Sequence, residues 1–236
     1  MASIYAKLKA FYKWGFDSLK PFPVHVFHHI PKCGGTSLRR VLIRWFDVVL
    51  DYRGHNDSVE QMNASKKDLN QLKKTHCLAG HWDIPGIHLK ERYPEIIDQA
   101  NNFFLFTFVR DPLDLKISLY FYELKTGKQV SHTLEERLFS SPNYIANRFP
   151  CTAENYKEIL SRYNFIGIIE QYEESIRRLA ELLGKKEVSL PHINRSDRNE
   201  EINNLSPDII EKFKQQNQLD YKIYEFCRKR FENYKV

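Results

Sequence analysis

Hydrophobic and polar positions divide this 236-residue chain into two kinds of segment. Short, nearly unbroken apolar runs are typical of strands that are covered on both faces of a parallel sheet. Longer segments, in which apolar residues recur every three or four positions, are typical of helices that cover such a sheet. Their alternation predicts an α/β fold: a three-layer sandwich with a central, mainly parallel sheet and ligands at the carboxyl ends of its strands.

The predicted strands span residues 24–30, 47–52, 75–80, 103–109 and 165–170. The predicted helices span residues 37–46, 64–73, 112–125, 133–140, 153–162, 173–184, 206–217 and 219–232. The sequence contains neither an internal repeat nor a linker long enough to separate two domains. We therefore expect one domain over residues 24–236, preceded by an N-terminal helical segment, residues 1–23.

The first predicted strand leads into an unusual loop. Residues 24–37 read VHVFHHIPKCGGTS, an apolar run followed by a lysine, two glycines and two hydroxyl residues. Pro31 ends the strand, and Gly34 and Gly35 allow a tight turn with the backbone left uncovered. Lys32 adds a positive charge beside this P-loop-like strand–loop–helix.

This loop is suited to an anion. Thr36 and Ser37 are expected to cap the helix that follows. The N–H groups of a helix N-terminus point outward and the helix dipole favours negative charge, so the loop predicts a phosphate site. It differs from the nucleoside-triphosphate loop, in which the lysine follows the glycines, because Lys32 precedes them. A plain strand-to-helix connection is the alternative.

A second candidate anion site follows the apolar run at residues 103–109. Arg110 comes directly after this strand, where ligands bind in open α/β sheets, and a guanidinium binds phosphate through two hydrogen bonds. Asp111 is expected to cap the next helix, and Ser118 lies eight residues after Arg110, about two helical turns on. The alternative is an ion pair between Arg110 and Asp111 at the start of the helix.

Taken together, PKCGGTS at residues 31–37 and R-D-P-x(5)-S at residues 110–118 resemble the sulfotransferases that use 3′-phosphoadenosine 5′-phosphosulfate (PAPS). The likeness is closest to the branch of heparan and uronyl 2-O-sulfotransferases and their bacterial relatives. Further matches to that branch are LAGH at 78–81, NYIANRF at 143–149, FIGIIEQYEESI at 165–176, HINRS at 192–196 and LDYKIYEFCRKRF at 219–231.

The resemblance implies transfer of a sulfuryl group from PAPS to a hydroxyl acceptor, a saccharide in this branch, without a metal. Its first loop would hold the 5′-phosphosulfate, and its arginine and serine would hold the 3′-phosphate. The late loop of the family closes over the nucleotide, and an ordinary polar loop is the alternative for that segment here. The implied donor-binding residues are Lys32, Cys33, Gly34, Gly35, Thr36, Ser37, Arg110 and Ser118, with Arg195 and Ser196 in the late loop.

Sulfuryl transfer also needs charge neutralisation on the leaving phosphate and a base for the hydroxyl proton. Lys32 suits the first task. His81 is the candidate base, because it ends a predicted strand and an imidazole ordinarily titrates near neutrality. The resembled branch has H-G-H where this chain has Ala79, glycine and His81, so we expect no two-histidine arrangement. A structural histidine is the alternative, and His88 and Glu170 are further candidates for the base.

Cys33 and a group of aromatic and basic residues are further candidates for roles at the site. Cys33 lies beside Lys32 at a helix N-terminus, which would lower the pKa of its thiol, although we expect it only to pack within the loop. Aromatic and basic residues near the predicted site suit a sugar acceptor, with core packing as their alternative. These residues are Trp82, Tyr120, Tyr122 and Arg148.

The composition of the chain indicates what kind of partner it binds and in which cellular compartment we expect it. The formal net charge of +6 suggests an anionic partner, and PAPS accounts for part of it, while no nucleic-acid-binding motif is present. Residues 1–20 predict a basic amphipathic helix, either packed on its own domain or lying on a membrane surface. The four cysteines show no metal-ligand spacing, and we expect reduced thiols in a cytoplasmic, bacterial protein. The oligomeric state stays open.

Two other functions compete with sulfuryl transfer. A small-molecule or nucleotide kinase shares the strand–loop–helix geometry, but it needs a carboxylate that holds Mg²⁺ and a lysine after the glycines. A non-catalytic module that binds polyanions would use the basic surface and would bind tightly, in a salt-sensitive way, without turnover.

Overall fold

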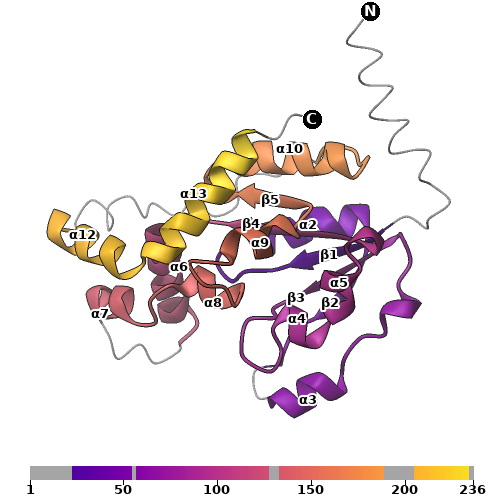
Figure 1. Cartoon of the computed structure of the whole chain (residues 1–236), viewed down its shortest axis with the longest axis horizontal. Helices are drawn as coiled ribbons and strands as arrows, with labels where there is room; N and C mark the ends of the chain where they lie inside the picture. Colours follow the sequence, from indigo (N-terminus) through magenta and orange to yellow (C-terminus); the bar gives the residue numbers. More distant parts are fainter. Residues whose placement is uncertain (1–22, 55–56, 128–132, 189–204, 234–236) are drawn as a thin grey trace, which may run out of the picture.

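The computed structural model describes residues 23–54, 57–127, 133–188 and 205–233. The helix expected in residues 1–20 lies outside these ranges. Within them, five strands form one sheet in the order β2-β3-β1-β4-β5, and every neighbouring pair is parallel (Figure 1). The strands are β1 (Val24–His28), β2 (Asp47–Asp51), β3 (His76–Gly80), β4 (Phe103–Val109) and β5 (Phe165–Ile168). Because all strands run in one direction, their carboxyl ends meet at one edge.

The centre of the sheet is apolar on both faces. All seven residues of β4 are buried, and its register places Phe106 beside Phe27 of β1 and Phe165 of β5. Thr107 is the polar exception within β4, and its hydroxyl donates a 2.7 Å hydrogen bond to the carbonyl of His28. All five predicted strands and the parallel α/β arrangement are confirmed, since consecutive apolar residues are needed only where both faces of a sheet are covered.

Helices flank this sheet and complete the sandwich (Figure 1). No helix in the described ranges is long and apolar enough to cross a membrane. The helices are α2 (Gly35–Trp45), α3 (Val59–Ala64), α4 (Leu89–Arg92), α5 (Pro94–Asp98), α6 (Pro112–Lys125), α7 (Leu134–Phe139), α8 (Tyr144–Arg148), α9 (Tyr156–Ser161), α10 (Tyr172–Leu182), α12 (Pro207–Gln216) and α13 (Gln218–Glu232), with 3₁₀ turns at Leu69–Gln71, Ala100–Asn102 and Ile169–Gln171.

The prediction of a helix over residues 64–73 is wrong. Helix α3 begins earlier, because the side chains of Ser58 and Gln61 form a reciprocal capping box at its N-terminus. It ends at Ala64, and the Asp68 carboxylate then accepts the N–H of Asn70 and starts a 3₁₀ turn instead. Local side-chain hydrogen bonds thus override the apolar spacing of this segment.

Helices α6, α7 and α12 gather beside the sheet, at the left of Figure 1. They share a small apolar cluster that contains Leu113, Ile117, Leu138 and Phe213 and is separate from the main core. The cluster fixes α6 from the side opposite the sheet. This matters for function because α6 begins directly after β4 and carries several of the predicted site residues.

Candidate functional site

The loop between β1 and α2 forms the first part of the site. Lys32 and Gly34 both adopt positive φ angles, 66° and 72°, and the N–H of Cys33 donates to the carbonyl of Ile30 at 3.2 Å. Residues 31–34 therefore form a tight turn, and α2 begins directly after it, at Gly35. The turn predicted from the two glycines is therefore present, and its first glycine has the left-handed conformation that glycine favours.

The first turn of α2 presents backbone N–H groups. Gly34 occupies the N-cap position, and no side chain caps the helix, so the prediction that Thr36 or Ser37 caps it is wrong. The helical hydrogen bonds begin with the N–H of Leu38, which donates to the carbonyl of Gly34 at 3.0 Å. The N–H groups of Gly35, Thr36 and Ser37 therefore lack an intrahelical acceptor, and the first turn has no acidic residue to compete for them.

Gly35 is required by a close approach. A Cβ atom at this position would lie 1.7 Å from Nε2 of His29, so any side chain would displace that imidazole. His29 follows β1 and lies directly against the backbone of the loop. The glycine thus allows a ring side chain and the loop to occupy neighbouring positions.

Lys32 and Cys33 lie in different environments. The ammonium of Lys32 lies 4.1 Å from the centroid of the Tyr122 ring in α6, so the positive charge is held at the rim of the loop. Cys33 is buried, and burial raises the pKa of its thiol far above the ordinary value. The expected lowering of this pKa is wrong, because desolvation outweighs the neighbouring positive charges.

Arg110 lies just before the start of α6, at the edge where the strands end, and Ser118 lies about two turns further along the chain, within the helix. Arg110 follows β4 and forms an ion pair with Asp114, Nη2 to Oδ2 3.6 Å, rather than with Asp111. The Asp111 side chain caps α6 as predicted, accepting from the N–H of Leu113 at 2.9 Å. The Nε atom of Arg110 is buried and has no hydrogen-bond partner among the described residues. It is one of six such buried side-chain atoms among the described residues, and an external acceptor bound at this edge of the sheet would satisfy it. Ser118 is buried within α6.

His81 follows β3 and has a histidine partner after all. Its Nε2 lies 2.8 Å from Nδ1 of His29, which also lies 3.1 Å from the hydroxyl of Tyr52. The expectation of no two-histidine arrangement is wrong, because the partner is His29, the residue after β1, rather than a residue at the position of Ala79. Burial lowers the pKa of His81 to about 4 and that of His29 well below its usual range, so both rings are neutral at pH 7. The expected titration of His81 near neutrality is likewise wrong.

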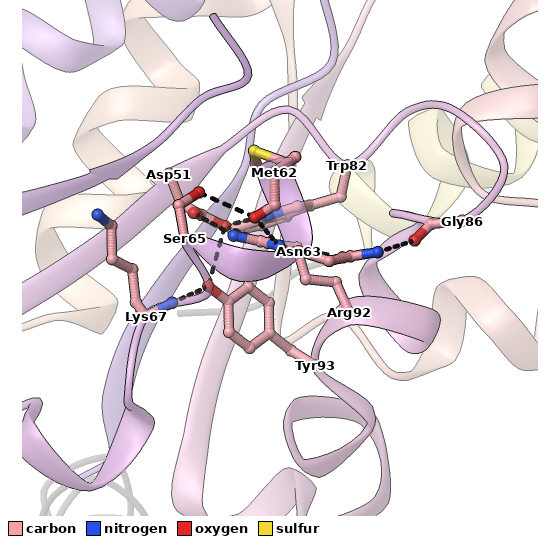
Figure 2. Close-up of polar contacts among 9 residues, drawn as sticks. All are labelled: Asp51, Met62, Asn63, Ser65, Lys67, Trp82, Gly86, Arg92 and Tyr93. Atoms are coloured by element: carbon pink, nitrogen blue, oxygen red, sulfur yellow. Dashed lines mark hydrogen bonds and ion pairs between the residues drawn. The ribbon is translucent and has the colours of Figure 1, made fainter. Parts of the chain in front are cut away.

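A buried polar network, made of Asp51, Trp82, Arg92 and Tyr93, fixes the residues beside this histidine pair (Figure 2). Nε and Nη2 of Arg92 donate to the two carboxylate oxygens of Asp51, each at 2.8 Å. Trp82 and Tyr93 donate to Oδ2 of the same carboxylate at 2.8 and 2.9 Å. Asp51 precedes Tyr52 and Trp82 follows His81, so the network joins the ends of β2 and β3.

The same network removes one predicted acceptor contact. The Trp82 side chain is fully buried, so its interpretation as a stacking surface for a sugar is wrong. Of the other three candidates, Tyr122 is 44% exposed, and Tyr120 packs against Phe121 with ring centroids 5.2 Å apart. Arg148 is half-buried, and its guanidinium donates to the carbonyl of Asp83 at 2.6 Å.

Two segments singled out in the sequence, residues 143–149 and 219–231, cap each other. The buried carboxylate of Asp220 in α13 accepts the N–H groups of Ile145 and Ala146 in α8, at 2.9 and 2.8 Å. The side chain of Asn143 in turn accepts the N–H of Leu219 at 3.1 Å. This reciprocal arrangement fixes α8, which carries Arg148, against α13.

The other candidates for the base, Glu170 and His88, both have hydrogen-bond contacts within the protein. Glu170 accepts the N–H of Asp111 and the hydroxyl of Tyr224, both at 2.9 Å, so its carboxylate joins β5 to α6 and α13. His88 is buried, with Nδ1 3.4 Å from the carbonyl of Trp82. Arg195 and Ser196 lie outside the described residues.

The chain is similar to known sulfotransferases in sequence and in fold. The sequence model of the sulfotransferase family matches residues 19–227. No curated protein matches this chain. The sulfotransferase from Alicyclobacillus acidocaldarius is 16% identical, with a TM-score of 0.51 over 89% of this chain and 97% of its own. The mouse sulfotransferase SULT7A1, complexed with PAP, is 12% identical, with a TM-score of 0.54 over 86% of this chain and 89% of its own. Both structures share the fold of this chain.

Proposed function

We propose that this chain, which belongs to the sulfotransferase family, transfers the sulfuryl group of PAPS to the hydroxyl of a saccharide by in-line displacement. One observation carries the choice of donor. The uncapped first turn of α2 and the unpartnered Nε of Arg110 lie at the same edge of the sheet, which suits a ligand with two separate phosphate groups. The mouse neighbour was determined with PAP, adenosine 3′,5′-bisphosphate, the product that such a reaction leaves.

The donor would be held at both of its phosphates. The N–H groups of Gly35, Thr36 and Ser37 would bind the 5′-phosphate, where the positive end of the helix dipole favours an anion. Arg110 would bind the 3′-phosphate through its guanidinium, together with the hydroxyl of Ser118. Two fixed ends leave the sulfuryl group in one orientation, which a direct in-line displacement requires.

The transfer step then needs two further groups. Lys32 would leave the face of Tyr122 and neutralise the charge that builds on the bridging oxygen of the leaving phosphate. His81, neutral at pH 7, would accept the proton of the attacking hydroxyl. The new O–S bond forms as the bond from sulfur to the bridging oxygen breaks, PAP departs, and the proton remains on the imidazole until solvent removes it.

The saccharide acceptor rests on the resemblance to heparan and uronyl 2-O-sulfotransferases, with support from the surface. Tyr122 is an exposed aromatic ring beside the donor loop, and Arg148 is a half-buried cation on α8. An aromatic face and a cation suit a sugar that carries anionic groups. A screen of hydroxyl compounds with labelled PAPS identifies the acceptor.

Equilibrium binding separates this function from its two competitors. We would titrate the protein by calorimetry with PAP, with ATP plus Mg²⁺, and with a single-stranded oligonucleotide, each at two salt concentrations. The proposal predicts that PAP binds most tightly. Preference for ATP with Mg²⁺ would indicate a kinase, and tight, steeply salt-dependent binding of the oligonucleotide would indicate a polyanion-binding module; either result overturns the proposal.

A further inference from the structure

Three ring side chains meet where strands β1, β2 and β3 end. His29 lies between Tyr52 and His81, with its Nδ1 atom 3.1 Å from the tyrosine hydroxyl and 2.8 Å from Nε2 of His81. The rings of Tyr52 and His81 also touch directly, with centroids 4.7 Å apart and planes at 78°. Each of the three side chains therefore restricts the orientation of the other two.

The short contact between the two imidazoles restricts where the protons lie. Two neutral rings can approach to this distance only if one nitrogen carries hydrogen and the other offers its lone pair. If His29 donated, His81 would accept at Nε2, carry its hydrogen on Nδ1 and have no lone pair left for a reacting hydroxyl. If His81 donates from Nε2, its Nδ1 keeps the lone pair. Only the second arrangement lets His81 act as a base.

The position of His29 is itself fixed. Its ring lies against Gly35, where a Cβ atom would come within 1.7 Å, and stacks beside Phe27 with ring centroids 5.3 Å apart. Asp51 precedes Tyr52 and Trp82 follows His81, and the indole N–H of Trp82 donates to the carboxylate of Asp51 at 2.8 Å. Figure 2 shows this hydrogen bond. The imidazole of His29 is therefore confined between the backbone of Gly35 on one side and the rings of Phe27 and Tyr52 on the others.

We propose that His29 is a positioning residue that accepts the Nε2 hydrogen of His81 and thereby leaves Nδ1 of His81 to receive the acceptor's proton. This inference rests on the proposed function for the role of His81 as base. His29 thus selects the tautomer of His81. Because its ring lies against Gly35, the position of His29 also depends on the loop between β1 and α2. Tyr52 packs the pair and is a second, longer contact of the same nitrogen.

The tautomer of His81 is directly measurable. We would record two-bond proton–nitrogen correlation spectra at pH 7 of protein labelled with nitrogen-15 histidine, for wild type, His29→Asn and His29→Phe. Asparagine keeps an acceptor near the position of Nδ1, whereas phenylalanine keeps a ring and removes the acceptor. His76→Asn, at the opposite end of β3, is the matched control.

We expect wild-type His81 to carry hydrogen on Nε2 and none on Nδ1, and His29→Asn and His76→Asn to keep this form. In His29→Phe the Nε2 hydrogen would face a ring without an acceptor, a costly position, so the Nδ1–H form should become the main one. Wild-type His81 with its hydrogen on Nδ1 overturns the inference. An unchanged tautomer in His29→Phe overturns it as well.

Turnover provides a second reading. The orienting aspartate of serine proteases contributes up to about 10⁴-fold to kcat, and a neutral imidazole in this role is expected to contribute less. Turnover measured at saturating PAPS, where a change in donor affinity does not enter, should therefore fall by at least about 10-fold in His29→Phe, and His29→Asn should recover most of the loss. The spectra need neither donor nor acceptor, so failure of the proposed function, seen as absent PAP binding, is distinguishable from failure of this inference.

Discussion

Removing the guanidinium of Arg92 tests how strongly the Asp51 network holds the site (Figure 2). Arg92 is 2% exposed and Asp51 3% exposed, and the two share a pair of 2.8 Å charge-assisted hydrogen bonds. In Arg92→Met the carboxylate keeps the hydrogen bonds from Trp82 and Tyr93 but loses both charged donors. Nη1 of Arg92 also leaves the carbonyl of Met62, to which it donates at 2.6 Å.

The expected cost follows from this burial. Breaking a buried ion pair by removing one partner costs about 3–5 kcal/mol, because the other charge stays in a low-dielectric surrounding. Two neutral donors still face Asp51, so we expect the lower end of that range, about 3 kcal/mol. The matched control is Arg162→Met. Arg162 pairs with Glu158 at 3.1 Å, but the two side chains are 39% and 71% exposed, and such a pair is worth less than about 1 kcal/mol.

Urea unfolding of both variants at pH 7 gives the two free energies of unfolding on one scale. A further variant, Asp51→Asn with Arg92→Met, should recover part of the loss, because no uncompensated charge remains. The reasoning is refuted if Arg92→Met costs no more than Arg162→Met. It is also refuted if the double variant is less stable than Arg92→Met alone.

The further predictions concern three single residues. Arg110→Ala should weaken PAP binding by roughly 1.5–3 kcal/mol and leave adenosine 5′-phosphate binding unchanged by calorimetry, and equal losses would show that Arg110 does not contact the 3′-phosphate. His81→Ala should lower turnover roughly 10²–10⁴-fold with PAP affinity intact. The acidic limb of the wild-type pH–rate profile should lie at about pH 4, where burial has moved the pKa of His81, and a limb near pH 6.5 would contradict this. Burial raises the pKa of Asp220 to about 6, above its unfolded value of about 3.9, so its contribution to stability should be full below pH 4 and lost as the pH rises through 6. Urea unfolding from pH 4 to 8 should show a flatter dependence for Asp220→Asn, and an unchanged slope would refute this.

The strands and the position of the site are predictable from sequence because their signals are local. The run at residues 103–109 is apolar at nearly every position, and Arg110 directly follows it; Lys32 follows the earlier run at residues 24–30 after one proline. Parallel strands then bring these two residues to one edge of the sheet. The start of α2 shows the limit of this reasoning. Thr36 and Ser37 have cap-forming side chains, but the turn places Gly34 at the cap instead.

The parts that sequence could not predict depend on contacts between distant segments. His29 and His81 are 52 residues apart, and Arg92 and Asp51 are 41 apart, so no local pattern joins them. The pKa of Cys33 shows the same limit. Its neighbours in sequence favour the thiolate, whereas the surrounding core, which only the fold assembles, opposes it more strongly.

The structure of the complex with PAP tests the central claim most directly. We predict that the 5′-phosphate contacts the N–H groups of Gly35, Thr36 and Ser37, with the ammonium of Lys32 beside it. We expect the 3′-phosphate on Arg110 and Ser118, and the imidazole of His81 on the side from which a hydroxyl would approach. PAP bound away from the first turn of α2, or with its 3′-phosphate not in contact with Arg110, would contradict this claim.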